Sequence, residues 1–210
     1  MTTDDLISLL AAKIQAVDTR LPVRRYYLAV LGATAASTLL MAQWLGVRPT
    51  LARDLSAPMF WTKEAFCVAL SAAGLAAVLR LARPGRALGW VPGGVAAPLI
   101  GIWLVAAGAL LAADAPGRTD LFFGQTAGVC PFRIALLSAP VLVAIFWAMK
   151  ALAPTRLRLA GGFAAGAVGA LVYCLHCPEL AAPFLGTWYV LGILIPTIIG
   201  ALIGPRLLRW

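Results

Sequence analysis

Six long apolar runs alternate with short polar gaps along this chain of 210 residues. The runs occupy residues 26–45, 60–81, 91–113, 134–152, 159–175 and 188–207. Each is close to the roughly 20 residues with which a helix crosses the hydrocarbon core of a bilayer. No run alternates polar and apolar residues with a period of two, as the strands of a transmembrane barrel do. Because backbone groups in lipid must pair within their own segment, the pattern predicts an all-α integral membrane bundle of six transmembrane helices over residues 26–210.

The distribution of charge predicts how this bundle is oriented. The chain is 62% hydrophobic and 12% charged, whereas a soluble domain carries about 25% charged residues. Twelve of the 17 lysines and arginines lie before the first run, in or within three residues of the second and fourth gaps, or within the last five residues of the chain. The five on the other side are Arg48, Arg53, Lys63, Arg118 and Arg133. The positive-inside rule therefore predicts a multi-pass membrane protein with both termini in the cytoplasm.

The net charge of +9 raises the question of nucleic-acid binding. The basic residues flank the apolar runs, and no long basic segment occurs in the sequence. We therefore expect the lipid bilayer, and no direct nucleic acid, to be the partner of these charges.

The N-terminal segment, residues 1–25, is the only sizeable segment outside the predicted spans. Its pattern predicts a cytoplasmic amphipathic helix with two acids in the first turn and an apolar stripe, separated from the first span by Pro22. The candidate partner-binding residues are Asp4, Asp5, Leu6, Leu9, Leu10, Ile14 and Val17. Such a helix either lies on the membrane surface or docks its stripe into a groove of a protein partner. The acidic start of the polar face suits lipid poorly, but the pattern alone leaves both interpretations open.

Ionisable residues deep within the spans would indicate transport, and the sequence has almost none. Lys63 and Glu64 fall in the first turn of the second span, from which we expect both side chains to snorkel outward. No Ser-His-Asp set, phosphate-binding loop or pair of catalytic carboxylates can be assembled from the chain. The sequence therefore predicts neither an enzyme nor a cofactor, and a small transporter or channel is a weak alternative.

Small residues predict how the last two spans pack. Gly162 and Gly166 are four residues apart in the fifth span, and Gly200 and Gly204 have the same spacing in the sixth. This spacing allows the backbones of two helices to approach closely.

The cysteines are the main candidates for chemistry. Cys130 lies at the outer end of the fourth span, and Cys174 and Cys177 bracket the outer end of the fifth, beside the single histidine, His176. All three of these thiols would face the oxidising side of the membrane. Cys67 lies about two turns into the second span, where an inert buried thiol is expected.

Three interpretations of the outer cysteines remain open. The first is a structural disulfide between Cys130 and Cys177, stapling two loops. The second is a sensor of oxidants or thiophilic metals, in which His176 lowers the pKa of a neighbouring thiol or joins Cys130 and Cys177 as a candidate ligand, without a firm metal site. The third is a membrane thiol-disulfide oxidoreductase that uses the Cys-x-x-Cys pair Cys174 and Cys177.

Short motifs along the whole chain resemble the NrsF family. They are the start Met1-Thr2-Thr3-Asp4-Asp5-Leu6-Ile7, residues 58–63 (PMFWTK), residues 83–85 (RPG), Cys130, residues 176–179 (HCPE), residues 188–192 (WYVLG) and residues 204–210 (GPRLLRW). Each is short, and their order and spacing make the resemblance specific.

The resemblance implies a function. NrsF proteins are six-span inner-membrane anti-sigma factors that negatively regulate an extracytoplasmic-function (ECF) sigma factor of the sigma-F type. The N-terminal segment would then hold the sigma factor on the cytoplasmic side. Cys130 and Cys177 would be needed for the response to stress such as heavy metals or oxidants. The family pattern gives no role to Cys67 or Cys174, and Cys174 and His176 are candidate supporting residues only because they lie beside Cys177.

Overall fold

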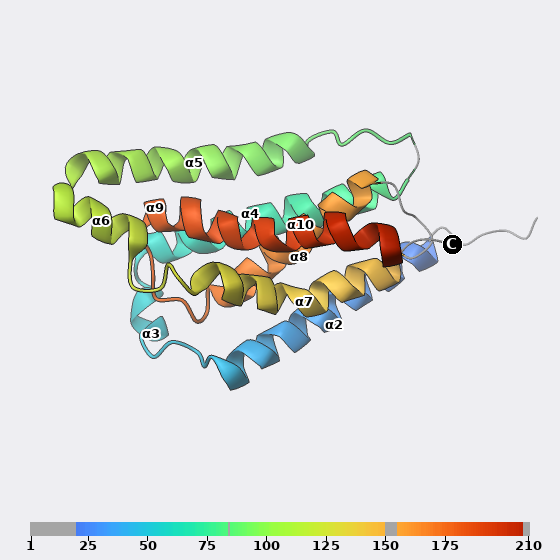
Figure 1. Ribbon diagram of the computed structural model, residues 1–210, viewed down its shortest axis with the longest axis horizontal. Coiled ribbons are helices and arrows are strands. Elements are labelled where there is room, and N and C mark those ends of the chain that lie inside the picture. Colours follow the sequence, from blue (N-terminus) through green and yellow to red (C-terminus); the bar gives the residue numbers. More distant parts are fainter. Residues whose placement is uncertain (1–19, 84, 150–154, 208–210) are drawn as a thin grey trace, which may run out of the picture.

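The described residues form an all-helical bundle (Figure 1). The structure is a computed structural model that describes residues 20–83, 85–149 and 155–207. The helices are α2 (Arg20–Trp44), α3 (Leu51–Asp54), α4 (Pro58–Leu81), α5 (Val91–Ala112), α6 (Ala115–Phe123), α7 (Cys130–Ala148), α8 (Thr155–Tyr173), α9 (Ala182–Phe184), the π-helical turn η1 (Leu185–Tyr189) and α10 (Val190–Leu207). Residues 1–19 of the predicted N-terminal helix lie outside the described residues.

Within the described residues, five helices are long and apolar enough to cross a membrane, whereas the sequence predicts six. They cover Val23–Trp44, Pro58–Leu81, Val91–Ala112, Cys130–Ala148 and Ala182–Leu202. The fifth predicted span corresponds to α8, whose apolar part, Leu157–Tyr173, falls in the shorter class of 10–17 residues. Five of the six predicted spans therefore correspond to helices of membrane length, and the span at α8 stays a prediction. The run of residues 159–175 continues beyond the end of α8 into a turn, so apolar sequence there does not prolong the helix.

The long helices run alternately in opposite directions, and α8 lies at the centre of the bundle (Figure 1). It packs against α10, α4, α7 and α2. A Cβ atom added to Gly162 would lie 2.4 Å from the carbonyl oxygen of Pro196, and one added to Gly166 would lie 2.8 Å from that of Ile193. The predicted close approach of the last two spans at these glycines is confirmed.

Prolines mark where several helices begin. Pro58 and the second residues of α5 and α7 lie in first turns, where the missing N–H costs no intrahelical hydrogen bond. Pro22 lies within the described helix α2, which continues through it without a break. The prediction that Pro22 separates the first span from a preceding helix is therefore wrong for the described part of α2.

The two ends of the bundle differ in charge. The five described carboxylates, Asp54, Glu64, Asp114, Asp120 and Glu179, belong to the end that carries α3, α6 and α9. At the opposite end, Arg80, Arg83 and Arg86 line a cavity of about 340 Å³ together with Tyr27 and Trp90. We call these the acidic end and the basic end.

The sides of the bundle are apolar. Large hydrophobic side chains such as Leu31, Leu104, Leu111, Val143 and Leu202 are exposed on the outward faces of the long helices. Helices that are hydrophobic all round are typical of membrane spans.

Candidate functional site

The four cysteines gather in one hydrophobic core near the acidic end. Cys174 and Cys177 belong to the segment between α8 and α9, and we call residues 174–179 the cysteine turn. The backbone N–H of Cys174 bonds to the carbonyl of Ala170, and that of Cys177 to the carbonyl of Tyr173. Helical hydrogen bonds therefore continue past the end of α8 until Pro178, which cannot donate one.

Cys130 and Cys177 form the first thiol pair. Cys130 is the first residue of α7, and its thiol hydrogen-bonds to the sulfur of Cys177. Both side chains are fully buried, and neither sulfur is in a disulfide. The hydroxyl oxygen of Thr126 lies 3.9 Å from the Cys177 sulfur. The fold thus brings together the two predicted sensing residues, from segments 47 positions apart, as free thiols.

The surroundings favour the thiolate form of Cys177. Its pKa falls from 9.0 to about 5, because the Cys130 thiol donates to its sulfur, the Lys63 ammonium lies nearby and the backbone N–H of Glu179 points at it. These contacts outweigh burial, which acts in the opposite direction. The surroundings therefore favour the thiolate at Cys177 and the protonated thiol at Cys130.

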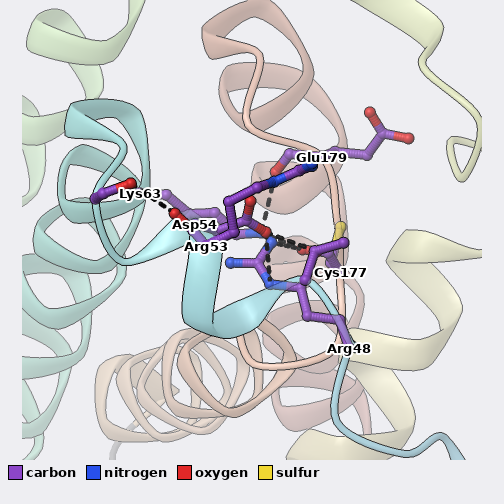
Figure 2. Close-up of polar contacts among 8 residues, drawn as sticks. Arg48, Arg53, Asp54, Lys63, Cys177 and Glu179 are labelled. Carbon is purple, nitrogen blue, oxygen red and sulfur yellow. Dashed lines mark hydrogen bonds and ion pairs between the residues drawn. The ribbon is translucent and has the colours of Figure 1, made fainter.

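Two buried cations hold the backbone of the cysteine turn (Figure 2). The Lys63 ammonium donates to the carbonyl oxygens of Cys177, at 2.8 Å, and Glu179, at 3.0 Å. Nη1 of Arg48 donates to the same Cys177 carbonyl at 2.7 Å. Nε of Arg48 also lies 3.4 Å from Oδ2 of Asp54. The prediction that Lys63 snorkels outward is wrong, because the lysine is fully buried and satisfies backbone carbonyls instead of water.

The end of α2 is bonded directly to the cysteine turn. The backbone N–H of Arg48 donates to the carbonyl of Leu175 at 3.2 Å. Nδ1 of His176 lies 2.9 Å from the carbonyl oxygen of Gly46. With the Arg48 side chain, three hydrogen bonds join residues 46–48, which directly follow α2, to residues 175–177.

The His176 ring is occupied on both nitrogens. Because a carbonyl can only accept, Nδ1 carries the proton, and Nε2 accepts from Nη1 of Arg133 at 3.1 Å. His176 therefore links α2 to α7 and presents no free nitrogen to the thiols. Among the described residues, no group of three or more histidine, cysteine, aspartate or glutamate side chains is placed to hold a metal ion.

Cys67 and Cys174 form a second thiol pair. The Cys174 thiol donates to the Cys67 sulfur across 3.4 Å, and both side chains are fully buried. Cys174 thus faces α4 instead of forming a two-cysteine site with Cys177, the geometry that an oxidoreductase of the Cys-x-x-Cys type would use. Cys67 is buried, as expected, and its sulfur has a thiol partner that the sequence did not predict.

A loop covers the first thiol pair. Oε1 of Glu179 accepts from the backbone N–H of Gln125 at 2.7 Å. At Gly124 φ is +52°, and an added Cβ would lie 2.6 Å from the Glu179 carboxylate. The positive φ favours glycine here, and a larger residue would also displace the Glu179 carboxylate from Gln125. The bond between Gln125 and Glu179 holds the segment between α6 and α7 against the cysteine turn.

Sequence reasoning missed Arg48, Gly46, Lys63 and the pairing of Cys67. One signal was available, because a lysine inside an apolar run must find a partner within the protein or reach water. The partners are backbone carbonyls of a turn more than 100 residues away, and no residue type in that turn reveals them.

The fold and the site define a class: an all-helical protein of membrane-length apolar helices with buried thiols gathered near one end. The family described as "Negative regulator of sigma F", NrsF, matches residues 10–210. The chain belongs to this family.

Two curated relatives match over their whole length. One, named "Probable anti-sigma-F factor NrsF", is from Azospira oryzae and is 51% identical over 213 residues, covering 100% of both chains. Another, named "Anti-sigma-F factor NrsF", is from Caulobacter vibrioides and is 41% identical over 219 residues, again covering 100% of both. No solved structure shows significant similarity to this chain.

Proposed function

We propose that this protein is a membrane-bound anti-sigma factor that sequesters an ECF sigma factor of the sigma-F type. The N-terminal segment docks the sigma factor, and reaction of Cys130 and Cys177 with an oxidant or a thiophilic metal releases it. Membership of a family of negative regulators of sigma F supports the regulatory part of this proposal. The observation that carries the sensing part is the buried pair of free thiols whose turn is bonded to the end of α2.

The proposal places the bundle in the bacterial inner membrane with both termini in the cytoplasm. The apolar outward faces of the long helices favour the bilayer. Most of the described arginines lie at one end, and the described carboxylates lie at the other together with Arg48, Arg53, Arg118 and Arg133. The positive-inside rule favours a cytoplasmic position for the end with the larger number of arginines. The thiols then lie toward the periplasm, the oxidising side.

Helix α2 connects the two functions. Its C-terminal end meets the cysteine turn through Gly46 and Arg48, and its other end leads toward the N-terminal segment. A change in the turn at Cys177 therefore acts first on the bonds made by Arg48 and His176. The movement of α2 that follows changes how the N-terminal segment is presented at the cytoplasmic face.

The chemistry at the pair takes one of two forms. In oxidation, the Cys130 and Cys177 thiols lose two protons and two electrons to an oxidant, and an S–S bond forms. In metal capture, both thiols lose their protons and the two thiolates bind a soft metal ion. Either event removes the hydrogen bond between the two thiols. A coupling free energy of about 1–3 kcal/mol then suffices to weaken the sigma factor complex between about 5-fold and 150-fold.

A thiol-disulfide oxidoreductase using Cys174 and Cys177 has less support. Cys174 contacts Cys67, and Cys177 contacts Cys130. We therefore propose a regulator without a catalytic step.

Affinity purification from native membranes tests the proposal. The full-length protein is compared with a variant lacking residues 1–19, and the retained proteins are identified by mass spectrometry. We expect that a sigma factor is retained by the full-length protein and not by the shortened variant. Retention by both forms would refute docking through the N-terminal segment, and the absence of a sigma factor from both would refute sequestration.

A further inference from the structure

The second thiol pair is not explained by the proposed sensor. Cys67 and Cys174 are hydrogen-bonded across 3.4 Å, and both side chains have no exposed surface. Cys67 is ten residues into α4, which places it about 14 Å along the helix from Pro58 at 1.5 Å per residue. Cys130, in contrast, is the first residue of its helix. The second pair therefore lies deeper in the bundle than the first.

The two pairs meet in the cysteine turn. Cys174 and Cys177 are three residues apart, and the backbone N–H of each bonds to a carbonyl of the preceding turn. Tyr189 is the last residue of η1, directly before α10. Its side chain lies in the same core as all four thiols and within electrostatic range of them. The four sulfurs thus occupy one continuous core.

We propose that Cys67 and Cys174 are the exchange partners of the sensing pair and receive its disulfide. This inference rests on the proposed function, because it needs the disulfide between Cys130 and Cys177 to form first. The product is a disulfide between α4 and the end of α8, inside the bundle, with the sensing pair returned to its thiol form.

The exchange balances without a further reagent. The Cys174 sulfur, after loss of its proton, attacks the sulfur of Cys177, an S–S bond forms between them, and Cys130 leaves as a thiolate that takes up a proton. Cys67 then loses its proton and attacks the Cys174 sulfur, and Cys177 leaves as the thiolate. One S–S bond is broken and one is made, and no electrons enter or leave the protein.

All four thiols are fully buried, but the surroundings of the two pairs differ. The segment between α6 and α7, which has exposed residues, is bonded to the cysteine turn at Gln125 and lies 3.9 Å from the Cys177 sulfur at Thr126. Cys67 belongs to α4 and Cys174 directly follows α8, and these two helices pack extensively against each other. The inner thiols are therefore oxidised through the outer ones.

The test uses full-length protein in lipid nanodiscs and one equivalent of diamide, a diazene that takes two protons and two electrons from two thiols. The reaction is stopped by acid at successive times, free thiols are alkylated in denaturant, and disulfides are mapped by mass spectrometry. We expect the disulfide between Cys130 and Cys177 first, and that between Cys67 and Cys174 afterwards as the first one decays.

Two variants serve as controls. In the variant Cys130→Ser with Cys177→Ser, the inner disulfide should form at least about tenfold more slowly, because its donor is gone. In the variant Cys67→Ala, the disulfide should be found only among Cys130, Cys174 and Cys177, because the final acceptor of the exchange is missing. An outer disulfide that persists in the wild type, or an inner disulfide that forms equally fast in the double variant, would refute the exchange and leave the sensor proposal intact. If no outer disulfide formed in the wild type, oxidative sensing and exchange would both be refuted.

Discussion

Single residues at the site show how burial and charge combine. A fully buried lysine is costly unless its charge is satisfied. Lys63 meets this condition with two carbonyl oxygens, and its charge also stabilises the Cys177 thiolate. The same side chain therefore shapes the cysteine turn and activates its thiol.

Replacement of Lys63 tests this activation. In Lys63→Met we expect the pKa of Cys177 to rise from about 5, because one of the charges that stabilise the thiolate is removed. The thiolate predominates above the pKa, so the midpoint of the pH–rate profile should move upward by at least about one pH unit. This midpoint is measured from the rate at which methyl methanethiosulfonate modifies Cys177, followed on the Cys177 peptide from about pH 4 to about pH 9.

Arg118→Met is the matched control, since it removes an exposed cation from the same end of the bundle. Its profile should coincide with that of the wild type. An unchanged midpoint in Lys63→Met would contradict the role assigned to the lysine.

At the scale of the element, α2 is the connection between the cysteine turn and the N-terminal segment. The contacts at its end involve backbone and side-chain atoms of Gly46 and Arg48. Arg48 is buried and also packs over the ring of Phe60, with 5.2 Å from its guanidinium carbon to the ring centroid. Loss of this side chain should loosen α2 from the turn while leaving both thiols in place.

Arg48→Met tests the coupling. We expect its thiols to form the same disulfide as the wild type, whereas oxidation should change sigma factor retention by less than about half of the wild-type free-energy change. Retention is measured on immobilised protein before and after diamide. Arg53→Met, on the adjoining α3 and exposed, is the control. Full release from oxidised Arg48→Met would show that the signal does not pass through this contact.

The packing of α8 against α10 gives a stability prediction. In Gly162→Val the added side chain meets the backbone of Pro196 and Thr197, so the two helices must separate. We expect destabilisation by about 1–3 kcal/mol, as for other overpacked cores, measured by thermal unfolding in detergent. Gly101→Val is the control, because nothing lies within 4 Å of its added Cβ. Equal losses in the two variants would contradict the packing argument.

Sequence periodicity predicted the elements unevenly. Length and hydropathy were sufficient for α2, α4, α5 and α7, whose bounds lie close to the predicted runs. They were insufficient for α8, because a helix enclosed by protein carries the same apolar residues as one that faces lipid. The last span begins at Ala182, six residues before the predicted start at Trp188, since the apolar residues before it were assigned to a loop.

For the whole molecule, the distribution of charge was readable from the sequence, but the contacts of the site were not. Arginine positions predicted two chemically different ends, and the described residues have them. The convergence of Arg48 and Lys63 on the cysteine turn, and the bond from His176 in that turn to Gly46, depend on the packing of helices far apart in the chain. No local pattern contains that information.

The orientation of the basic end is a prediction at this scale. A fluorescent reporter that folds only in the cytoplasm, fused after Trp210, should be active in the inner membrane, because the arginine-rich gaps are retained inside. The same reporter placed after Gly117 in the loop that contains α6 should be inactive. Activity at Gly117 and inactivity at Trp210 would reverse the topology and place the thiols in the cytoplasm.

The most direct test of the central claim measures the affinity of the protein for its sigma factor in both states of the thiols. Full-length protein in nanodiscs is titrated with the co-purified sigma factor before and after oxidation, beside the variant Cys130→Ser with Cys177→Ser. The account predicts at least about fivefold weaker binding by the oxidised wild type and no change in the double variant. Equal affinities of the reduced and oxidised wild type, or equal weakening in the double variant, would contradict it.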